Sequence, residues 1–413
     1  GLGRYADGRR LENYKIARKI ILDYCIVNSL LADYWLQLID GSLSCWLVGA
    51  LLLVVIHQVY YYLRYIRLKK CKPTEIAGEL PAVSVIVCAR NEEDNLRDYL
   101  HTLLNQDYPN YEVIVVDDGS EDQTTMILEQ YARLNKHMYH TFVPREARVM
   151  STKKLALTIG VKAAHYDYLL MTDADCRPES RNWIREMMSG FICGGEQIEV
   201  VLGYGAYFEN NTLLSSLINY DTLFIGLQYL GMAAAGYPYM GVGRNLAYKK
   251  DTFFKNHGFR GLLNERSGDD DLFVNKVTNS HNTAIVCSRD SITWSPPKTT
   301  WKEWFHQKRR HLSVSPHYKR SSKLRLGIEP ITRGLVYALL IATFIFGNGL
   351  AMCIAYGLWC LRLIIQLCVI NISAHRLGGR MFGIEIVAYD MLLPLISLWI
   401  LITQRFRKRQ LYW

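Results

Sequence analysis

The ten cysteines of this chain follow no spacing that would join them into a site. None forms a C-x-x-C pair, and several lie inside apolar runs. This pattern excludes a disulfide framework and a zinc-ribbon type of site, and it favours a reducing compartment for the soluble part. Residues 1–42 also lack a clear signal-peptide cleavage pattern. We interpret them as an N-terminal extension, either an interfacial helix or a poorly ordered segment.

A complete dinucleotide-binding fingerprint and any nucleic-acid-binding motif are missing as well. Residues 241–248 read G-V-G-R-N-L-A-Y, which lacks the third glycine and does not open a βαβ unit. The net charge of +10 could indicate a nucleic-acid partner. The basic residues crowd residues 64–72, 298–325 and 405–409, however, each beside an apolar run. We therefore expect contact with anionic lipid headgroups and no nucleic acid.

Hydrophobic residues make up 50% of the chain and charged residues 21%, which predicts a soluble domain joined to membrane segments. Residues 43–66 are predicted to be a transmembrane helix, because their apolar run reaches the ~20 residues that cross a bilayer. The run ends in three tyrosines, followed by Arg64, Arg67 and Lys69. By the positive-inside rule the chain would enter the cytoplasm here. The alternative is a buried core helix.

The C-terminal region, residues 331–403, is also predicted to lie in the membrane, in two to three segments. Residues 335–370 would form a helix of about 54 Å, too long for a hydrocarbon core of ~30 Å, so we expect a turn near residues 347–349. Arg362 and Gln366 would then face a protein interior, or their helix would be partly interfacial. Four crossings in all would place the basic tail, residues 404–413, outside, against the positive-inside rule. A re-entrant or interfacial last segment, kinked at Pro394, would resolve this conflict.

Between these flanks, residues 79–292 predict an α/β domain. Apolar runs at 83–88, 111–116 and 168–171, of which the first is rich in β-branched residues, alternate with helical segments. This is the pattern of a doubly wound sheet with strands buried on both faces. The first run leads into A-R-N-E-E, the second into D-D-G-S and the third into T-D-A-D. Since ligands bind at the carboxyl ends of the strands in such sheets, we expect these polar groups to meet at one edge.

The carboxylates of Asp173 and Asp175 are one residue apart, which suits a hard divalent cation that also holds phosphate oxygens. Asp is also common in the turn after a strand, but three acidic strand ends at one edge favour the metal site. A further acidic segment, residues 268–271, opens a predicted helix. On its own it could be a charge cluster that favours the helix start.

Residues 293–325 predict an amphipathic helix in the membrane interface. Trp301, Trp304 and Phe305 fall on one face, while Lys308 and Arg310 lie largely elsewhere. An ordinary surface helix packed on the domain, with solvated charges, is the alternative.

Five motifs in order, A-R-N-E-E, V-V-D-D-G-S, T-D-A-D, G-D-D and Q-x-x-R, resemble the family 2 glycosyltransferases of GT-A fold. The resemblance covers about residues 80–312. It is strongest to the membrane-embedded branch that includes cellulose, hyaluronan, chitin-oligosaccharide and poly-N-acetylglucosamine synthases and ceramide glucosyltransferase. The resemblance implies a GT-A domain flanked by transmembrane helices, with a UDP-sugar as donor substrate.

On the donor side, the resemblance implies roles for five residues. Glu92 and Asp117 would bind the uridine part of the nucleotide, and Lys153 would help to hold the nucleotide. Asp173 and Asp175 would hold Mg²⁺ or Mn²⁺ on the diphosphate.

On the reacting side, it implies that Asp270 is the general base, which takes the proton of the acceptor hydroxyl. Asp271 is adjacent and leaves that assignment open. Gln307 and Arg310 would close over the diphosphate, whose developing charge the metal and cations would neutralise. A base opposite the leaving group gives in-line attack and inversion at the anomeric carbon. Where most of the branch has Trp after the Arg, this chain has His311, which leaves the acceptor and processivity undetermined.

The expected function is therefore an inverting glycosyltransferase that moves a sugar from a UDP-sugar to a membrane lipid or lipid-linked glycan. It would be an integral membrane protein with its catalytic domain on the cytoplasmic face. The small number of membrane segments motivates this choice. The alternatives are a processive polysaccharide synthase and a non-catalytic membrane scaffold.

Overall fold

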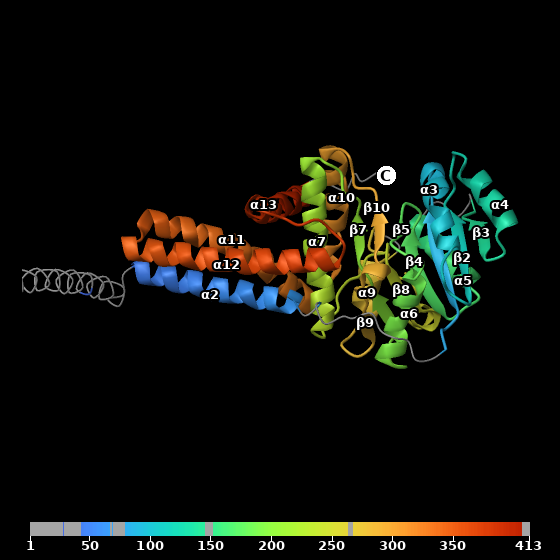
Figure 1. The fold of residues 1–413 in the computed structure, drawn as a ribbon, viewed down its shortest axis with the longest axis horizontal. Helices are drawn as coiled ribbons and strands as arrows, with labels where there is room; N and C mark the ends of the chain where they lie inside the picture. Colours follow the sequence, from blue (N-terminus) through green and yellow to red (C-terminus); the bar gives the residue numbers. More distant parts are fainter. Residues whose placement is uncertain are drawn as a thin grey trace, which may run out of the picture. The chain divides into compact units, whose positions relative to one another are not determined.

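The computed structural model describes residue 28 and residues 43–66, 68, 79–144, 152–262 and 267–406 (Figure 1). The predicted extension at 1–42 and the basic tail therefore lie almost wholly outside the described residues. The chain divides into two compact units, of which one comprises residues 1–58 and 332–363 and the other residues 59–331 and 364–413.

The larger unit contains two β-sheets. Its strands are β1 (Val83–Ala89), β2 (Tyr111–Asp117), β3 (Met138–Phe142), β4 (Tyr168–Asp173), β5 (Arg177–Pro178), β6 (Val200–Leu202), β7 (Gly205–Tyr207), β8 (Leu246–Lys249), β9 (Thr283–Ile285) and β10 (Thr293–Ser295). Among the described residues, seven strands form one sheet in the order β3-β2-β1-β4-β8-β6-β9, and three form a second in the order β5-β10-β7.

Helices cover both faces of the larger sheet and link it to the smaller one. They are α3 (Glu93–Leu104), α4 (Thr124–Leu134), α5 (Thr152–Ala163), α6 (Trp183–Gly194), α7 (Leu213–Ala234), α8 (Lys250–Lys255), α9 (Asp271–Val277) and α10 (Trp301–Leu312). Short 3₁₀ turns, η3 (Arg289–Ser291) and η4 (Ser315–His317), stand before β10 and after α10. Figure 1 shows α3, α4 and α5 around β1, β2 and β3.

The central strands form where the sequence predicts them because their side chains are buried on both faces. Val83, Val85 and Val87 of β1 belong to one apolar cluster, and Ile86 belongs to the other. α5 packs closely on the second face at Gly160, where an added Cβ would lie 2.6 Å from the Ile86 side chain. These runs therefore stabilise the sheet by burial of apolar surface on either side.

The first four strands are all parallel, and β1 pairs in level register with both β2 and β4. The rest of the sheet is not doubly wound: β8 runs antiparallel to β4 and to β6. The edge strand β3 was not predicted, because only Met138 of its five residues is buried and its sequence has no continuous apolar run. Its position beyond β2 leaves the polar ends of β1, β2 and β4 side by side.

One backbone carbonyl accepts hydrogen bonds from both sheets. The hydroxyls of Thr172 on β4 and Thr293 on β10 donate to the carbonyl oxygen of Arg244, at 3.0 and 3.1 Å. The buried amide side chain of Asn245 donates to the carbonyls of Tyr204 and Ser291. The segment that precedes β8 is thereby fixed directly beside the end of β4.

Four helices among the described residues are long and apolar enough to cross a membrane: α2 (Leu43–Tyr65), α11 (Arg320–Phe346), α12 (Gly349–Arg376) and α13 (Glu385–Phe406, over its first 19 residues). α11 and α12 meet at residues 347–348, within the expected turn. Within the smaller unit, buried Arg362 donates to Gln58, which donates to Thr332. Arg362 therefore faces protein.

In the larger unit, α13 packs on helices of the α/β domain. The Tyr389 hydroxyl hydrogen-bonds that of Ser216 on α7, and the Trp399 ring packs edge-on against Phe305 of α10. Buried Gln366, on the last part of α12, donates to the Tyr220 hydroxyl and to Oδ1 of Asp390. Arg362 and Gln366 are thus both buried against protein, which agrees with the expectation that they face a protein interior.

Candidate active site

The carboxyl ends of β1, β2 and β4 form the edge at which the acidic groups collect. Asp173 is the last residue of β4, and Asp175 follows in the turn after it. Ligand atoms of Asp173, Asp175 and Cys176 lie within 4.8 Å of one another. Burial and the neighbouring Asp175 raise the pKa of Cys176 well above its usual value, so this thiol stays protonated. The two carboxylates are therefore the groups suited to a hard divalent ion.

Lys153 lies between the two acidic motifs. Its ammonium lies 3.1 Å from Oδ1 of Asp173 and 3.4 Å from Oδ2 of Asp269. Desolvation lowers the pKa of Lys153, but the charges of these carboxylates outweigh it and raise that pKa well above its usual value. A permanent positive charge therefore links the end of β4 to the start of α9.

The three acids at 269–271 differ in environment. Burial raises the pKa of Asp269, but Lys153 and Lys154 attract its charged form more strongly, so its pKa is lowered overall. Burial and the charge of Asp269 raise the pKa of Asp270. Burial and the charge of Asp270 raise the pKa of Asp271 to about 8.

Hydrogen bonds hold the last two of these acids in place. Oδ2 of Asp270 accepts the backbone N–H of Gly243 at 2.6 Å, and Oδ1 accepts that of Asp271 at 2.8 Å. The carboxyl of Asp271 is bonded to the Tyr318 hydroxyl at 2.7 Å and is buried. Asp270 is thus held toward the loop before β8, while Asp271 points into the core.

Glu92, just before α3, lies near the D-x-D pair. Burial raises the pKa of Glu92, and the charges of Asp175 and Asp173 raise it further. Its carboxylate accepts a hydrogen bond from the Asn95 side chain at 2.6 Å, which orients it at the strand end.

Asp117 ends β2 and is buried within its own loop. Its two oxygens accept the backbone N–H of Ser120 at 2.8 Å and the Thr125 hydroxyl at 2.5 Å. The neighbouring loop after β1 is tied to it, because the Asn91 side chain accepts the N–H of Glu121 at 2.8 Å. Asn91 has a φ of 54°, a left-handed conformation that Asn tolerates. Asp117 therefore shapes the loop between β2 and α4.

Arg244 was not identified from the sequence, yet it organises the other side of the site. Its guanidinium donates to the carbonyls of Gly205 and Ala206 and to the Ser295 hydroxyl, and it lies 4.2 Å from the centroid of the Tyr207 ring. The sequence feature that could have pointed to Arg244 was its place within the glycine-bearing segment at 241–248. Its partners are distant in sequence, and only the fold brings them together.

Gln307 and Arg310 lie on α10, which starts with a capping box between Thr300 and Glu303. The Gln307 amide donates to the Tyr207 hydroxyl at 2.9 Å. Arg310 is exposed, and its charge lowers the pKa of Asp269. The Q-x-x-R element therefore borders both the Arg244 cluster and the acidic cluster.

His311 is in part exposed. Desolvation by the surrounding protein and the positive charges of Arg310 and Arg244 lower its pKa to about 3. It is therefore a neutral imidazole at physiological pH.

The prediction for α10 is corrected at Lys308, which was placed away from the face that carries Trp304. Its side chain is buried, and its ammonium bonds both oxygens of Asp221 on α7. A buried acid on the facing helix explains the burial of this lysine.

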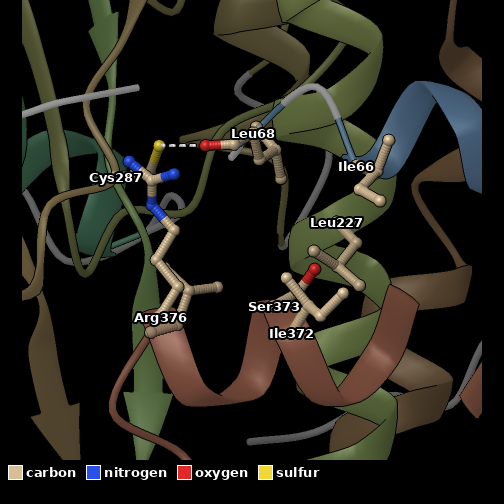
Figure 2. A pocket seen from close by; sticks show the side chains of 8 residues that line it. Ile66, Leu68, Leu227, Cys287, Ile372, Ser373 and Arg376 are labelled. Carbon is tan, nitrogen blue, oxygen red and sulfur yellow. Dashed lines mark hydrogen bonds between the residues drawn. The ribbon is translucent and has the colours of Figure 1, made fainter. Parts of the chain in front are cut away.

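A small pocket lies elsewhere in the larger unit, and Figure 2 shows it. Apolar side chains such as Ile66, Leu227 and Ile372 line it, together with the Arg376 guanidinium. The Cys287 thiol donates to the Leu68 carbonyl at 3.8 Å. Its lining includes none of the acidic motifs, so this pocket is separate from the candidate active site.

Comparison with known proteins agrees with this geometry. Residues 84–259 match the family model described as glycosyl transferase family 2. The Probable glycosyltransferase YdaM of Bacillus subtilis is 26% identical over 239 residues, 56% of this chain and 54% of that protein. The poly-beta-1,6-N-acetyl-D-glucosamine synthase of Staphylococcus epidermidis is 28% identical over 130 residues, 32% of this chain and 29% of that protein. The aligned part thus spans about half of the first relative and less than a third of the second.

Among solved structures, a mannosyltransferase from Pyrobaculum calidifontis, in complex with GDP-Man and Mn²⁺, has a TM-score of 0.58. It is 19% identical and covers 89% of this chain and 100% of its own. The likeness is one of fold. The predicted fold class, an α/β GT-A domain with flanking apolar helices, is confirmed.

Proposed function

The chain carries a family 2 glycosyltransferase domain of GT-A fold, and we propose that it transfers a sugar from a UDP-sugar to a membrane lipid or lipid-linked glycan, with inversion. The single observation that carries this proposal is the Lys153 bridge. One ammonium contacts both Asp173 and Asp269, so the acids that suit a metal–diphosphate lie beside the acids that suit a reacting hydroxyl.

The donor would lie along the edge of β1, β2 and β4. Asp173 and Asp175 are the residues that would hold Mg²⁺ or Mn²⁺, which would neutralise charge on the diphosphate leaving group. Glu92 and the loop shaped by Asp117 would border the uridine. Lys153 and Arg310 would add positive charge beside the leaving group as it departs.

Asp270 would take the proton from the acceptor hydroxyl as the new bond forms. Two backbone N–H groups orient its carboxylate, and its raised pKa makes it a stronger base than an ordinary carboxylate. Asp271 suits this role less well, because it is bonded to Tyr318 and buried away from the edge.

The contacts of α13 support a membrane topology for this proposal. One side of α13 packs on α7 and α10, while Leu392, Leu395 and Leu398 are exposed. A helix with one face on a soluble domain and an apolar outer face suits the membrane interface. With α2, α11 and α12 as crossings, the catalytic domain and the basic tail would share the cytoplasmic side, in accord with the positive-inside rule.

The test compares the Asp270→Asn and Asp175→Ala variants in purified protein supplied with UDP-sugars, Mn²⁺ and membrane lipid extract. Asp270→Asn should keep metal-dependent UDP binding and lose transfer. Asp175→Ala should lose the binding itself. The exposed Asp107, changed to Ala, is the control and should behave as wild type. Normal transfer by Asp270→Asn would remove Asp270 from its role.

A second candidate function is processive synthesis of a polysaccharide, which the matches to poly-beta-1,6-N-acetyl-D-glucosamine synthases favour. Mass spectrometry of the products separates the two. A lipid that carries one added sugar supports the first function, and a ladder of long products supports the second. A protein that binds UDP with metal but turns over no sugar nucleotide would contradict both and support a scaffold.

A further inference from the structure

A buried ion pair attaches α10 to α7. Nζ of Lys308 lies 2.6 Å from Oδ1 and 2.5 Å from Oδ2 of Asp221, and the two side chains are 9% and 13% exposed. Figure 1 shows the two helices beside one another. Because a lone charge at such a site is costly, each of these residues requires the other.

The pair stands at the centre of the Q-x-x-R element. Lys308 follows Trp304 by four residues, so the two share a helical face, and that face is buried. Gln307 and Arg310 flank it on the neighbouring face. At 3.6 residues per turn, any rotation of α10 that separates Lys308 from Asp221 also turns Gln307 and Arg310 away from their present places.

α7 is itself fixed by hydrogen bonds on its other faces. The Tyr220 hydroxyl accepts a hydrogen bond from Gln366 of α12, and Ser216 is bonded to Tyr389 of α13. The carboxylate of Asp221 is thus presented from a helix that is held in part by the last two apolar helices. Because Lys308 binds Asp221, the position of α10 depends on that of α7.

We propose that Asp221 is a positioning residue: through Lys308 it fixes the rotation and height of α10, and so holds Gln307 and Arg310 at the leaving-group side of the site. This inference rests on the proposed transfer function and assigns Asp221 no contact with substrate. An ion pair suits the task because it specifies one partner and one register, whereas apolar contacts between two helices tolerate small slips.

The experiment compares four variants of the full chain in lipid nanodiscs: Asp221→Asn, Lys308→Met, the neutral double variant, and the charge-swapped double variant Asp221→Lys with Lys308→Asp. An exposed pair on α8, Lys255 with Asp251, provides the matched control, Asp251→Asn. The measurements are kcat, KM for the UDP-sugar, metal-dependent UDP affinity and Tm.

Each single variant should lower kcat by about 10- to 100-fold, the range for a small misplacement of groups that act in the transition state. UDP affinity, which depends on the D-x-D pair, should change little. The neutral double variant should regain Tm because no buried charge remains, but it should not regain kcat. The swapped pair should regain part of kcat. Wild-type kcat in the single variants, or a kcat that simply follows Tm across the set, would overturn the proposal.

Backbone hydrogen exchange of residues 301–312, with and without UDP and Mn²⁺, separates this inference from the proposed function. Wild-type α10 should be protected from exchange, and Asp221→Asn should lose that protection at temperatures well below its Tm. Equal protection in both proteins would contradict the inference even if the wild type transfers sugar. If Asp221→Asn loses protection and the wild type transfers no sugar, the result supports the role of the ion pair in fixing α10 and refutes the transfer function.

Discussion

The ammonium of Lys153 lies 3.1 Å from Oδ1 of Asp173, so the D-x-D segment is already partly neutralised by the protein itself. A divalent ion bound there would meet one carboxylate that is shared with a lysine. In the proposed function, this contact would make the lysine both a partner for the diphosphate and a competitor of the metal.

Replacement of Lys153 by Met should therefore have two opposite effects. Affinity for Mn²⁺ alone should rise, because the carboxylates lose a competing cation. The transfer rate should fall by roughly 10- to 100-fold, because a charge beside the leaving group is gone. Spin-resonance titration of Mn²⁺ and initial rates measure the two effects. Lys162→Met, an exposed change on the same helix, should alter neither, and a parallel loss of metal affinity and rate in Lys153→Met would contradict the account.

The pH dependence of transfer should report the coupling of Asp269 and Asp270. Burial and the charge of Asp269 raise the pKa of Asp270, and a general base must be ionised, so the rate should rise with pH through that raised pKa. Asp269→Asn removes one raising influence and should move the acid limb of kcat/KM to lower pH. Profiles measured from about pH 4.5 to 8 decide this; a limb that moves upward or stays in place would count against Asp270 as the base.

Stability should vary with pH through Asp271. Its pKa is raised from 3.8 to about 8 in the folded chain, so between these values the folded state binds a proton that the unfolded state has lost. The free energy of unfolding should then fall as pH rises across this window. Asp271→Asn, which resembles the protonated form, should show a smaller fall in Tm between about pH 5 and 8. An unchanged slope would show that Asp271 ionises normally.

Gly243 should tolerate no side chain without a loss of rate. An added Cβ would lie 3.3 Å from Oδ2 of Asp270, the atom that accepts the Gly243 N–H. Gly243→Ala should displace this carboxylate by a few tenths of an ångström and lower kcat about 10-fold, with UDP affinity retained. Gly327→Ala is the control, because an added Cβ at that position meets nothing within 4 Å. Loss of UDP binding in Gly243→Ala would indicate a wider disturbance.

Much of the catalytic edge could be predicted from the sequence because it follows from local pattern. β1, β2 and β4 are continuous apolar runs, and parallel strands bring their carboxyl ends together. Asp173, Asp175 and the acids at 269–271 then meet through the fold. By contrast, β3 exposes Tyr139 and Phe142 to 49% and 64%, so its sequence does not resemble a buried strand.

The errors concern charges whose partners are distant in sequence. Lys308 was placed away from the aromatic face of its helix, where a lysine is normally found because its charge is costly to bury. Its partner Asp221 precedes it by 87 residues, and the choice of helix face depends on α7. Arg244 poses the same problem, since its acceptors lie on β7 and β10. A buried cation can be understood only when its anion or carbonyl acceptors are known.

The carbonyl of Arg244, which accepts hydroxyls from both sheets, has a consequence for engineering. Thr172 directly precedes Asp173, the carboxylate proposed to hold the metal, so the proposed donor site and the loop at 241–248 are joined through one carbonyl oxygen. A transplant of that loop from a relative with a different acceptor would not be modular. We expect it to change the geometry of the proposed donor site at the same time. Matched changes at residues 172 and 293 would have to accompany the transplant.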